Sequence, residues 1–482
     1  MAITAAVPEP NLLITAGVAI GAIGLMALAI STRYEITLAL LALYLGLLDG
    51  VIKLTTASQA ASSIRDVLIA AISLGAVIRI VSRRERVHLP PLSGWVIMFV
   101  TLVLVEAFNP ETKGLAKIAG GFRQHLEWIP FFFFGYAIMR SKGRFRAFFV
   151  ILGVIASLNG IVSTVQTQLS PSQLARWGPG YSARIYGTGG VSGRVYYTGK
   201  SERVRPPALG SDQGFGGYVG VLALPGALAL LAAGGIRRKP VLALLLCVGA
   251  LLAIATSLQR EAVLGGVAAL VAFAFLSLSA GRAVARPLGA LLAIIATVVV
   301  FVLVVSSSFN SEVFSRYSSI SPSSAGSTTV NYRAHTIAEI PTDIRHFPFG
   351  AGLATVGAAA GFGGEGTTRL SGESQYNYVA VELGVAGLIL WVAFSASIIA
   401  LAARSIRRIP DLEIRMSLSA VFAAFIAFTL MGFGGSTMSS LPFGPFFWFS
   451  VGIASFWFKE NRLELPPSRS YGKRTAPRIE PV

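Results

Sequence analysis

Long apolar runs alternate with short polar segments over most of the chain. The runs are about 20 residues each, which is long enough to cross roughly 30 Å of hydrocarbon as a helix. This pattern predicts an all-α fold, a polytopic transmembrane helical bundle of about 13 spans. Alternating strand patterns of about ten residues, typical of an outer-membrane barrel, are absent. The predicted spans centre near Gly21, Leu43, Ser73, Val100, Phe132, Ile155, Leu224, Val248, Ala269, Ala296, Gly387, Ala424 and Phe449.

The composition excludes an ordinary soluble protein. Of the 482 residues, 54% are hydrophobic and 13% are charged, whereas a typical soluble protein has about 25% charged residues. No positively charged region precedes the first apolar run. We therefore expect this run to remain as a membrane span and not to be cleaved as a signal peptide.

Two long polar loops interrupt the apolar pattern, and both are rich in Gly, Ser, Tyr and Arg. Loops longer than about 15 residues are usually functional or disordered. Within the second loop, Val330 to Asp343 has the pattern of a short helix, and Ser318 to Thr329 reads as a flexible segment. The predicted regions are N-terminal spans 1–169, first loop 170–215, central spans 216–305, large loop 306–373, C-terminal spans 374–460 and a disordered tail 461–482.

The positions of the basic residues predict the orientation. When alternate loops are placed on opposite sides, the short basic clusters fall on one side, which the positive-inside rule makes cytoplasmic. The N-terminus and both long loops are then outside, and the C-terminus is cytoplasmic. The clusters are Arg33, Arg83 to Arg86, Arg140 to Arg146, Arg237 to Lys239, Arg282 with Arg286, Arg404 to Arg408, and the tail from Lys459.

The net charge of +18 raises the possibility of nucleic-acid binding. Most of the basic residues lie in short loops between apolar runs, where they fix topology and meet anionic lipid headgroups, so we expect no nucleic-acid partner. The single cysteine, Cys247, allows no disulfide within the chain. Neither metal-ligand spacing nor a phosphate-binding Gly-x-x-x-x-Gly-Lys-Ser sequence is present, so neither a metal site nor an ATP-driven pump is indicated.

Arginines on the predicted outer side are candidates for phosphate binding. The guanidinium keeps its charge and presents a planar fork of donors that suits phosphate oxygens. Alternatively, these side chains are solvated loop charges or bind lipid headgroups. Arg260 differs from the others because it lies at a tight turn between two apolar runs, where an idle charge is harder to explain. The set is Arg176, Arg184, Arg194, Arg203, Arg205, Arg260 and Arg333.

Four carboxylates, Asp49, Glu106, Glu127 and Glu382, lie in or beside apolar runs. Carboxylates within a membrane suggest a proton-coupled transporter as one alternative. Asp49, Glu106 and Glu127 lie near predicted span ends, so we expect their side chains to reach the membrane surface.

Several ordered motifs resemble the O-antigen ligase and polysaccharide polymerase family. The large loop contains Arg333-Ala-His-Thr-Ile, then His346-Phe-Pro-Phe-Gly-Ala-Gly352, then Glu373-Ser-Gln-Tyr376, and Glu382-Leu-Gly-Val-Ala-Gly387 follows it. Two upstream elements, Ser257-Leu-Gln-Arg260 and Arg203 to Tyr218, are also similar. The resemblance covers about Arg203 to Gly387. This chain has Glu373 where the ligases have histidine, which favours a polymerase over a ligase.

The resemblance implies a C-type glycosyltransferase of the bacterial cytoplasmic membrane, without a cofactor, that uses a glycan on undecaprenyl diphosphate. Arg203, Arg205, Arg260 and Arg333 would bind the diphosphate and stabilise the charge on it as it leaves. Glu373 is the first candidate for the general base, because it stands at the family's histidine position, and His335 is the second.

Two tyrosines, Tyr376 and Tyr378, could stack on sugar rings or anchor the chain at the membrane interface. The implied partners are the lipid-linked oligosaccharide, an acceptor glycan or lipid, and a chain-length regulator. Two other classes stay open: a transporter or flippase of lipid-linked sugars, which needs a polar path through the spans, and a non-catalytic scaffold for envelope assembly, in which the outer arginines are dispensable.

Overall fold

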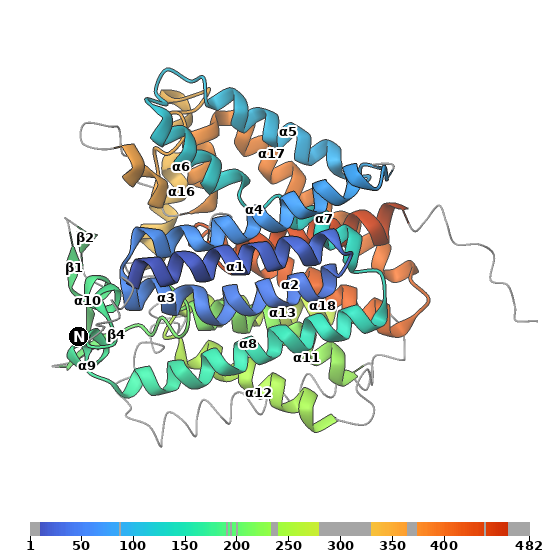
Figure 1. The fold of residues 1–482 in the computed structure, drawn as a ribbon, viewed down its shortest axis with the longest axis horizontal. Helices are drawn as coiled ribbons and strands as arrows, with labels where there is room; N and C mark the ends of the chain where they lie inside the picture. The colour runs from blue at the N-terminus through green and yellow to red at the C-terminus, as the bar shows by residue number, and fades with distance from the viewer. Residues whose placement is uncertain are drawn as a thin grey trace, which may run out of the picture.

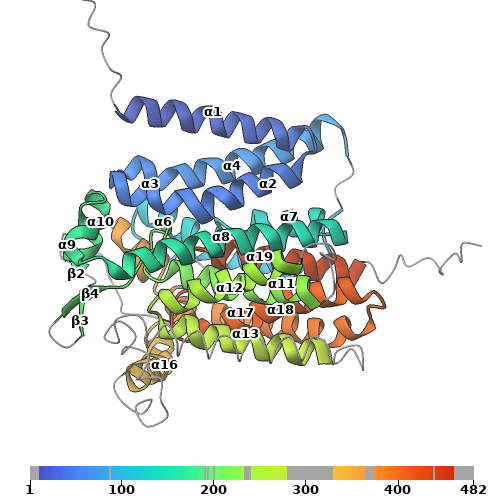
Figure 2. The same ribbon diagram turned by 90° about the horizontal axis from the view of Figure 1, so that it is seen from below.

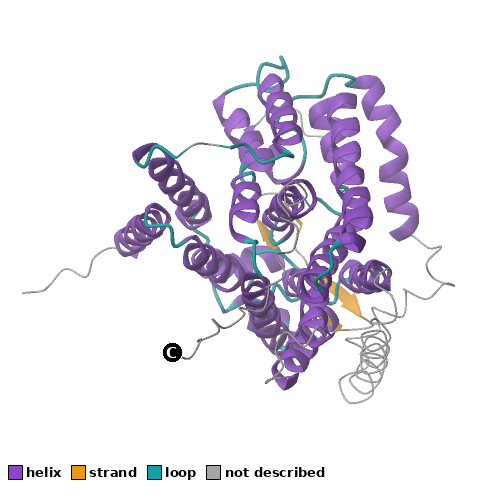
Figure 3. Ribbon diagram, turned by 90° about the vertical axis from the view of Figure 1, so that its right-hand side faces the viewer, coloured by secondary structure: helices purple, strands orange, loops and turns teal. Residues whose placement is uncertain are grey.

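The computed structural model describes residues 10–85, 88–188, 191–192, 195–198, 201–232, 240–278, 329–363, 374–437 and 440–460. Its long helices run alongside one another as an elongated bundle, with the short elements at one end (Figures 1 and 2). In Figure 3 the bundle is seen from the opposite end, with the small strands behind the helices. The described part of the chain is therefore predominantly helical, as predicted.

Helices account for almost all of the regular structure. The first half contains α1 (Pro10–Ile30), α2 (Tyr34–Leu43), α3 (Asp49–Thr56), α4 (Gln59–Ser82), α5 (Ser93–Glu106), α6 (Leu115–Leu126), α7 (Pro130–Ile138), α8 (Lys142–Gln168), α9 (Pro171–Ala175) and α10 (Pro179–Tyr186). The helices that follow are α11 (Phe215–Ala232), α12 (Pro240–Thr256), α13 (Arg260–Leu278), α16 (Thr329–His346), α17 (Gln375–Ser405), α18 (Leu412–Met431) and α19 (Phe443–Ala454).

Six of the described helical stretches are long and apolar enough to cross a membrane: Tyr34–Thr56, Lys142–Gln168, Phe215–Ala232, Arg260–Ser277, Gln375–Arg408 and Leu412–Met431. Three shorter apolar helices are Thr15–Ile30, Ser93–Glu106 and Pro240–Thr256. Every predicted span centre except Ala296, which lies outside the described residues, falls within a helix. The class of helical membrane protein is supported, and the count of 13 spans stays a prediction.

An aromatic cluster packs the centre of the bundle. Phe425 stacks on Phe447 at a centroid distance of 5.2 Å, and Phe447 stacks on Trp391 at 4.6 Å. These rings belong to α18, α19 and α17, and Phe447 and Phe425 are fully buried. Offset or edge contacts between such rings add to the dispersion energy of close packing, which is the main term that holds helices together where lipid replaces water.

Ion pairs join helix ends at the end of the bundle that carries basic clusters. Arg144, at the start of α8, pairs with Glu35 of α2. Arg146 forms a two-bond pair with Glu413 at 2.5 and 2.7 Å, and Lys142 Nζ lies 2.5 Å from Asp411 Oδ2. Burial opposes ionisation of Asp411, but the bonds from Lys142 and from the backbone N–H of Ile414 outweigh it and hold the pKa of this carboxyl below its usual value.

The opposite end of the bundle carries the polar loop elements α9, α10 and α16, together with four short strands (Figures 1 and 2). The strands form two antiparallel hairpins, β1 (Gly187–Thr188) with β2 (Val191–Ser192) and β3 (Val195–Thr198) with β4 (Ser201–Val204). The sequence did not predict these hairpins. The two polar regions that we predicted as long loops therefore share one end.

Candidate functional site

The segment before α11 meets the turn before α13. The Gln259 side-chain amide donates to the carbonyl of Gln213 at 3.4 Å. Gly214 has φ +76°, and a Cβ there would lie 2.1 Å from Gln259 Cγ, so the close approach requires glycine. Arg205, eight residues before Gln213, is half-buried, and so is Arg260, the first residue of α13. The structure thus brings together the chain segments of two predicted diphosphate-binding arginines.

The start of α17 lies beside the same turn. The backbone N–H of Gln375 donates to the carbonyls of Gly432 and Gly435 at 2.8 and 3.1 Å. A Cβ on Gly435 would lie 3.3 Å from Glu261 Oε1, and the Tyr218 hydroxyl donates to the other oxygen of Glu261 at 3.4 Å. Glu373, the first candidate base, lies outside the described residues, two positions before Gln375.

Helix α16 carries two more predicted site residues, Arg333 and His335, whose side chains lie outside the described part of the structure. The helix predicted for Val330 to Asp343 is confirmed. Near its C-terminal end, Asp343 bonds to Asn377 of α17, which fixes α16 against the start of α17. Burial, and then the nearby Glu339 charge, raise the pKa of Asp343, whereas the Asn377 bond lowers it by less.

The remaining predicted residues are placed as follows. Arg203 lies in β4, opposite Tyr196, and its side chain is not among those described. The Tyr376 ring stacks on Phe433 at a centroid distance of 4.4 Å, and its hydroxyl donates to the Thr429 carbonyl at 3.1 Å. Tyr378 is half-buried and packs near Gly357. One face of the Tyr376 ring is therefore covered, and sugar binding by either tyrosine stays a prediction.

Two motifs from the sequence analysis pack directly against each other. The Ala351 N–H donates to the Val381 carbonyl at 2.7 Å, and the Val385 N–H donates to the Pro348 carbonyl at 3.1 Å. Gly350 has φ +100°, and a Cβ there would lie 2.4 Å from the Glu382 carbonyl oxygen. Gly384 has φ +64° and interrupts α17. Glycines recur in the two motifs because the backbones touch and turn through left-handed conformations.

Glu382 is the centre of a buried hydrogen-bond network. Its Oε1 accepts the backbone N–H groups of Thr355 and Val356 at 3.0 Å each. Its Oε2 accepts the side chains of Gln124 at 3.0 Å and His125 at 2.6 Å. The four donors fill the acceptor sites of the carboxylate. Sequence reasoning missed Gln124 and His125 as partners, because more than 250 residues separate them from Glu382.

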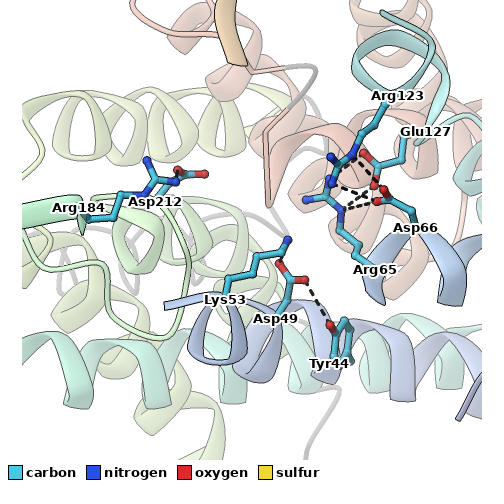
Figure 4. Close-up of polar contacts among 9 residues, drawn as sticks. All are labelled: Tyr44, Asp49, Lys53, Arg65, Asp66, Arg123, Glu127, Arg184 and Asp212. Atoms are coloured by element: carbon cyan, nitrogen blue, oxygen red, sulfur yellow. Dashed lines mark hydrogen bonds and ion pairs between the residues drawn. The ribbon is translucent and has the colours of Figure 1, made fainter. Parts of the chain in front are cut away.

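A second charged network joins α4 and the end of α6 (Figure 4). Arg65 forms a two-bond pair with Glu127 at 2.6 and 2.9 Å, and Arg123 pairs with Asp66 at 3.0 Å. The Arg65 guanidinium also lies 4.9 Å from the centre of the Trp128 ring. Charged residues beside apolar runs were the available signal for this network, and the sequence analysis used only Glu127.

The expectation that Asp49, Glu106 and Glu127 reach the membrane surface is wrong: the Glu127 side chain, in the network with Arg65, is 7% exposed. Asp49 is 1% exposed and bonds to Lys53 at 2.8 Å, and Glu106 is 5% exposed and accepts from Asn109 at 2.9 Å. Figure 4 shows Asp49 and Lys53 beside the ion pair of Arg65 and Glu127. Each carboxylate lies inside the protein because a polar partner within reach replaces the water that it loses.

A largely apolar groove runs between α2, α7, α8, α11 and α19, with a volume of about 250 Å³. Along α8 it extends from Gly143 to Ile155, which is roughly 18 Å at 1.5 Å per residue. Among the described residues that line it, Glu35 and Arg144 are the charged ones. Phe215 lines the groove and begins α11, directly after the segment that contacts Gln259. The groove therefore leads from the basic end toward the candidate site.

Within the described residues, no group of three or more His, Cys, Asp or Glu side chains is arranged to hold a metal ion. Comparison with known proteins finds no family model, no curated protein and no solved structure that matches this chain.

Proposed function

We propose that this protein is a membrane glycosyltransferase that polymerises, or alternatively ligates, oligosaccharides linked to undecaprenyl diphosphate. One observation carries the proposal: the Arg205 segment, the Arg260 turn and the start of α17 meet at one end of a helical bundle. Two arginine-bearing segments that are separate in the sequence are thereby available to one diphosphate. The order of motifs that resembles O-antigen ligases and polysaccharide polymerases supports the same assignment.

In the proposed reaction, an acceptor hydroxyl attacks the anomeric carbon of the donor sugar. The bond from that carbon to the diphosphate oxygen breaks with inversion, and the electron pair leaves on undecaprenyl diphosphate. Arg203, Arg205, Arg260 and Arg333 stabilise the leaving charge. Glu373 receives the hydroxyl proton, and His335 is the alternative base.

The proposal includes a topology. About 13 spans place both polar loop regions on the outer side of a bacterial cytoplasmic membrane, with the N-terminus outside and the C-terminus inside. The ion-paired end with Arg144 and Arg146 is then cytoplasmic. A chain-length regulator is a further proposed partner.

The direct test is purified protein with a diphosphate-linked oligosaccharide, assayed for chain extension and for released undecaprenyl diphosphate. The proposal predicts both products in equal amounts from wild-type protein. No product with an authentic donor would overturn it.

The apolar groove supports the lipid part of the proposal and gives a separate prediction. Ala147 lines the groove on α8, so we expect Ala147→Trp to raise the KM for the donor about tenfold. This corresponds to about 1.4 kcal/mol, close to two methylene groups that are no longer buried. The matched control is Leu158→Trp, at an exposed position of the same helix outside the groove. Equal effects of the two variants would contradict a role of the groove in donor binding.

A further inference from the structure

The chain between Gly350 and Val356 is buried although it forms no helix or strand. Its backbone groups are bonded at short intervals: the Gly350 carbonyl accepts from Asn109 at 2.9 Å, and the Leu353 N–H donates to Thr112 Oγ1 at 2.9 Å. Irregular backbone that is buried requires such partners, because a buried amide without a hydrogen bond is costly. This stretch, the clamped segment, is held by side chains from distant parts of the chain.

The strongest anchor of the clamped segment is Glu382. One of its oxygens binds two consecutive backbone N–H groups, and the other binds Gln124 and His125 of α6. Glu382 and His125 are 0% and 1% exposed. The carboxylate thus ties three elements to one point: the clamped segment, α6 and α17.

The clamped segment lies between the predicted reacting groups. It follows α16, which carries Arg333 and His335, and it precedes the short helix Gly357–Gly363, after which the chain leads to Glu373. Helix α17, which carries Glu382, begins two residues after Glu373. A shift of the clamped segment would therefore move α16, which carries Arg333 and His335, relative to α17.

We propose that Glu382 is a positioning residue, which holds the clamped segment so that α16, with Arg333 and His335, keeps its place relative to the donor. Thr112 assists by binding the Leu353 N–H. The catalytic consequence rests on the proposed function, whereas the anchoring does not. Because Glu382 is buried and fully bonded, it does not contact substrate itself. Its loss should lower kcat and leave the KM for the donor within about twofold.

The test compares Glu382→Gln with Thr112→Val, which removes one anchoring oxygen at nearly constant volume. The control is Glu413→Gln, whose carboxylate pairs with Arg146 at the basic end. In full-length protein in detergent, hydrogen exchange of peptides covering 350–356 should be at least tenfold faster in both test variants and unchanged in the control. With undecaprenyl-diphosphate-linked oligosaccharide as the donor, kcat should fall at least tenfold in Glu382→Gln.

Unchanged exchange in both test variants would overturn the anchoring. Faster exchange with a wild-type kcat would overturn the positioning role, as would equal losses in kcat and donor binding. If wild-type protein forms no product, the proposed function fails, and the exchange measurement still decides the anchoring by itself.

Discussion

We expect Arg260→Ala to reduce kcat/KM for glycosyl transfer by about 100-fold or more, at unchanged expression. Removal of one group that stabilises developing negative charge commonly costs this much. Arg260 is half-buried at the first residue of α13 and lies next to Gln259, which contacts the Arg205 segment. The positive end of the helix dipole adds to its field. The measurement is initial rate against donor concentration in purified protein.

Two further variants sharpen this experiment. Arg260→Lys keeps the charge and loses the planar fork of donors, so its activity should lie between that of wild type and Arg260→Ala. Arg176→Ala removes an exposed arginine of the same end of the bundle and should change the rate less than about threefold. Full activity of Arg260→Ala would remove Arg260 from the proposed diphosphate site.

The largest effect on stability is expected at the Arg65–Glu127 pair. The two side chains are 12% and 7% exposed and join through two hydrogen bonds. Arg65→Met leaves the Glu127 charge buried without its partner, so the free energy of unfolding should fall by about 3 to 5 kcal/mol. The double variant Arg65→Met/Glu127→Leu should recover most of that loss, because no uncompensated charge remains. Denaturant unfolding in detergent would measure both.

An exposed ion pair provides the control for this comparison. Arg144 and Glu35 are 36% and 43% exposed, so Arg144→Met should cost less than about 1 kcal/mol. If Arg65→Met is no more destabilising than Arg144→Met, the buried pair does not hold α4 against the end of α6.

The helical class and most helix positions could be predicted because an apolar run of about 20 residues has few alternatives. The helix over Val330 to Asp343 was also predictable from its local pattern. The hairpins before Val204 were missed, because strands this short lack a clear alternating pattern. Prediction of helices and strands from local sequence patterns was therefore more reliable in the apolar regions than in the polar ones.

The candidate site was less accessible to sequence reasoning. The glycines of His346 to Gly352 and Glu382 to Gly387 were visible as two motifs, but their mutual contact depends on a fold that brings both backbones together. The role of Gln124 and His125 could not be inferred, since each is an ordinary residue of an amphipathic helix until Glu382 is placed beside it. Buried carboxylates within apolar runs are thus the best sequence signal, although they do not reveal their partners.

The bonds of Glu382 also have a consequence for the order of assembly. Gln124 and His125 belong to the first third of the chain, while their acceptor is synthesised more than 250 residues later. Until α17 enters the membrane, these side chains lack the carboxylate that satisfies them, and unpaired polar groups are costly in an apolar setting. The early helices therefore complete their packing only once the late part of the chain has been made, which makes biogenesis of this protein a cooperative event spanning most of its length.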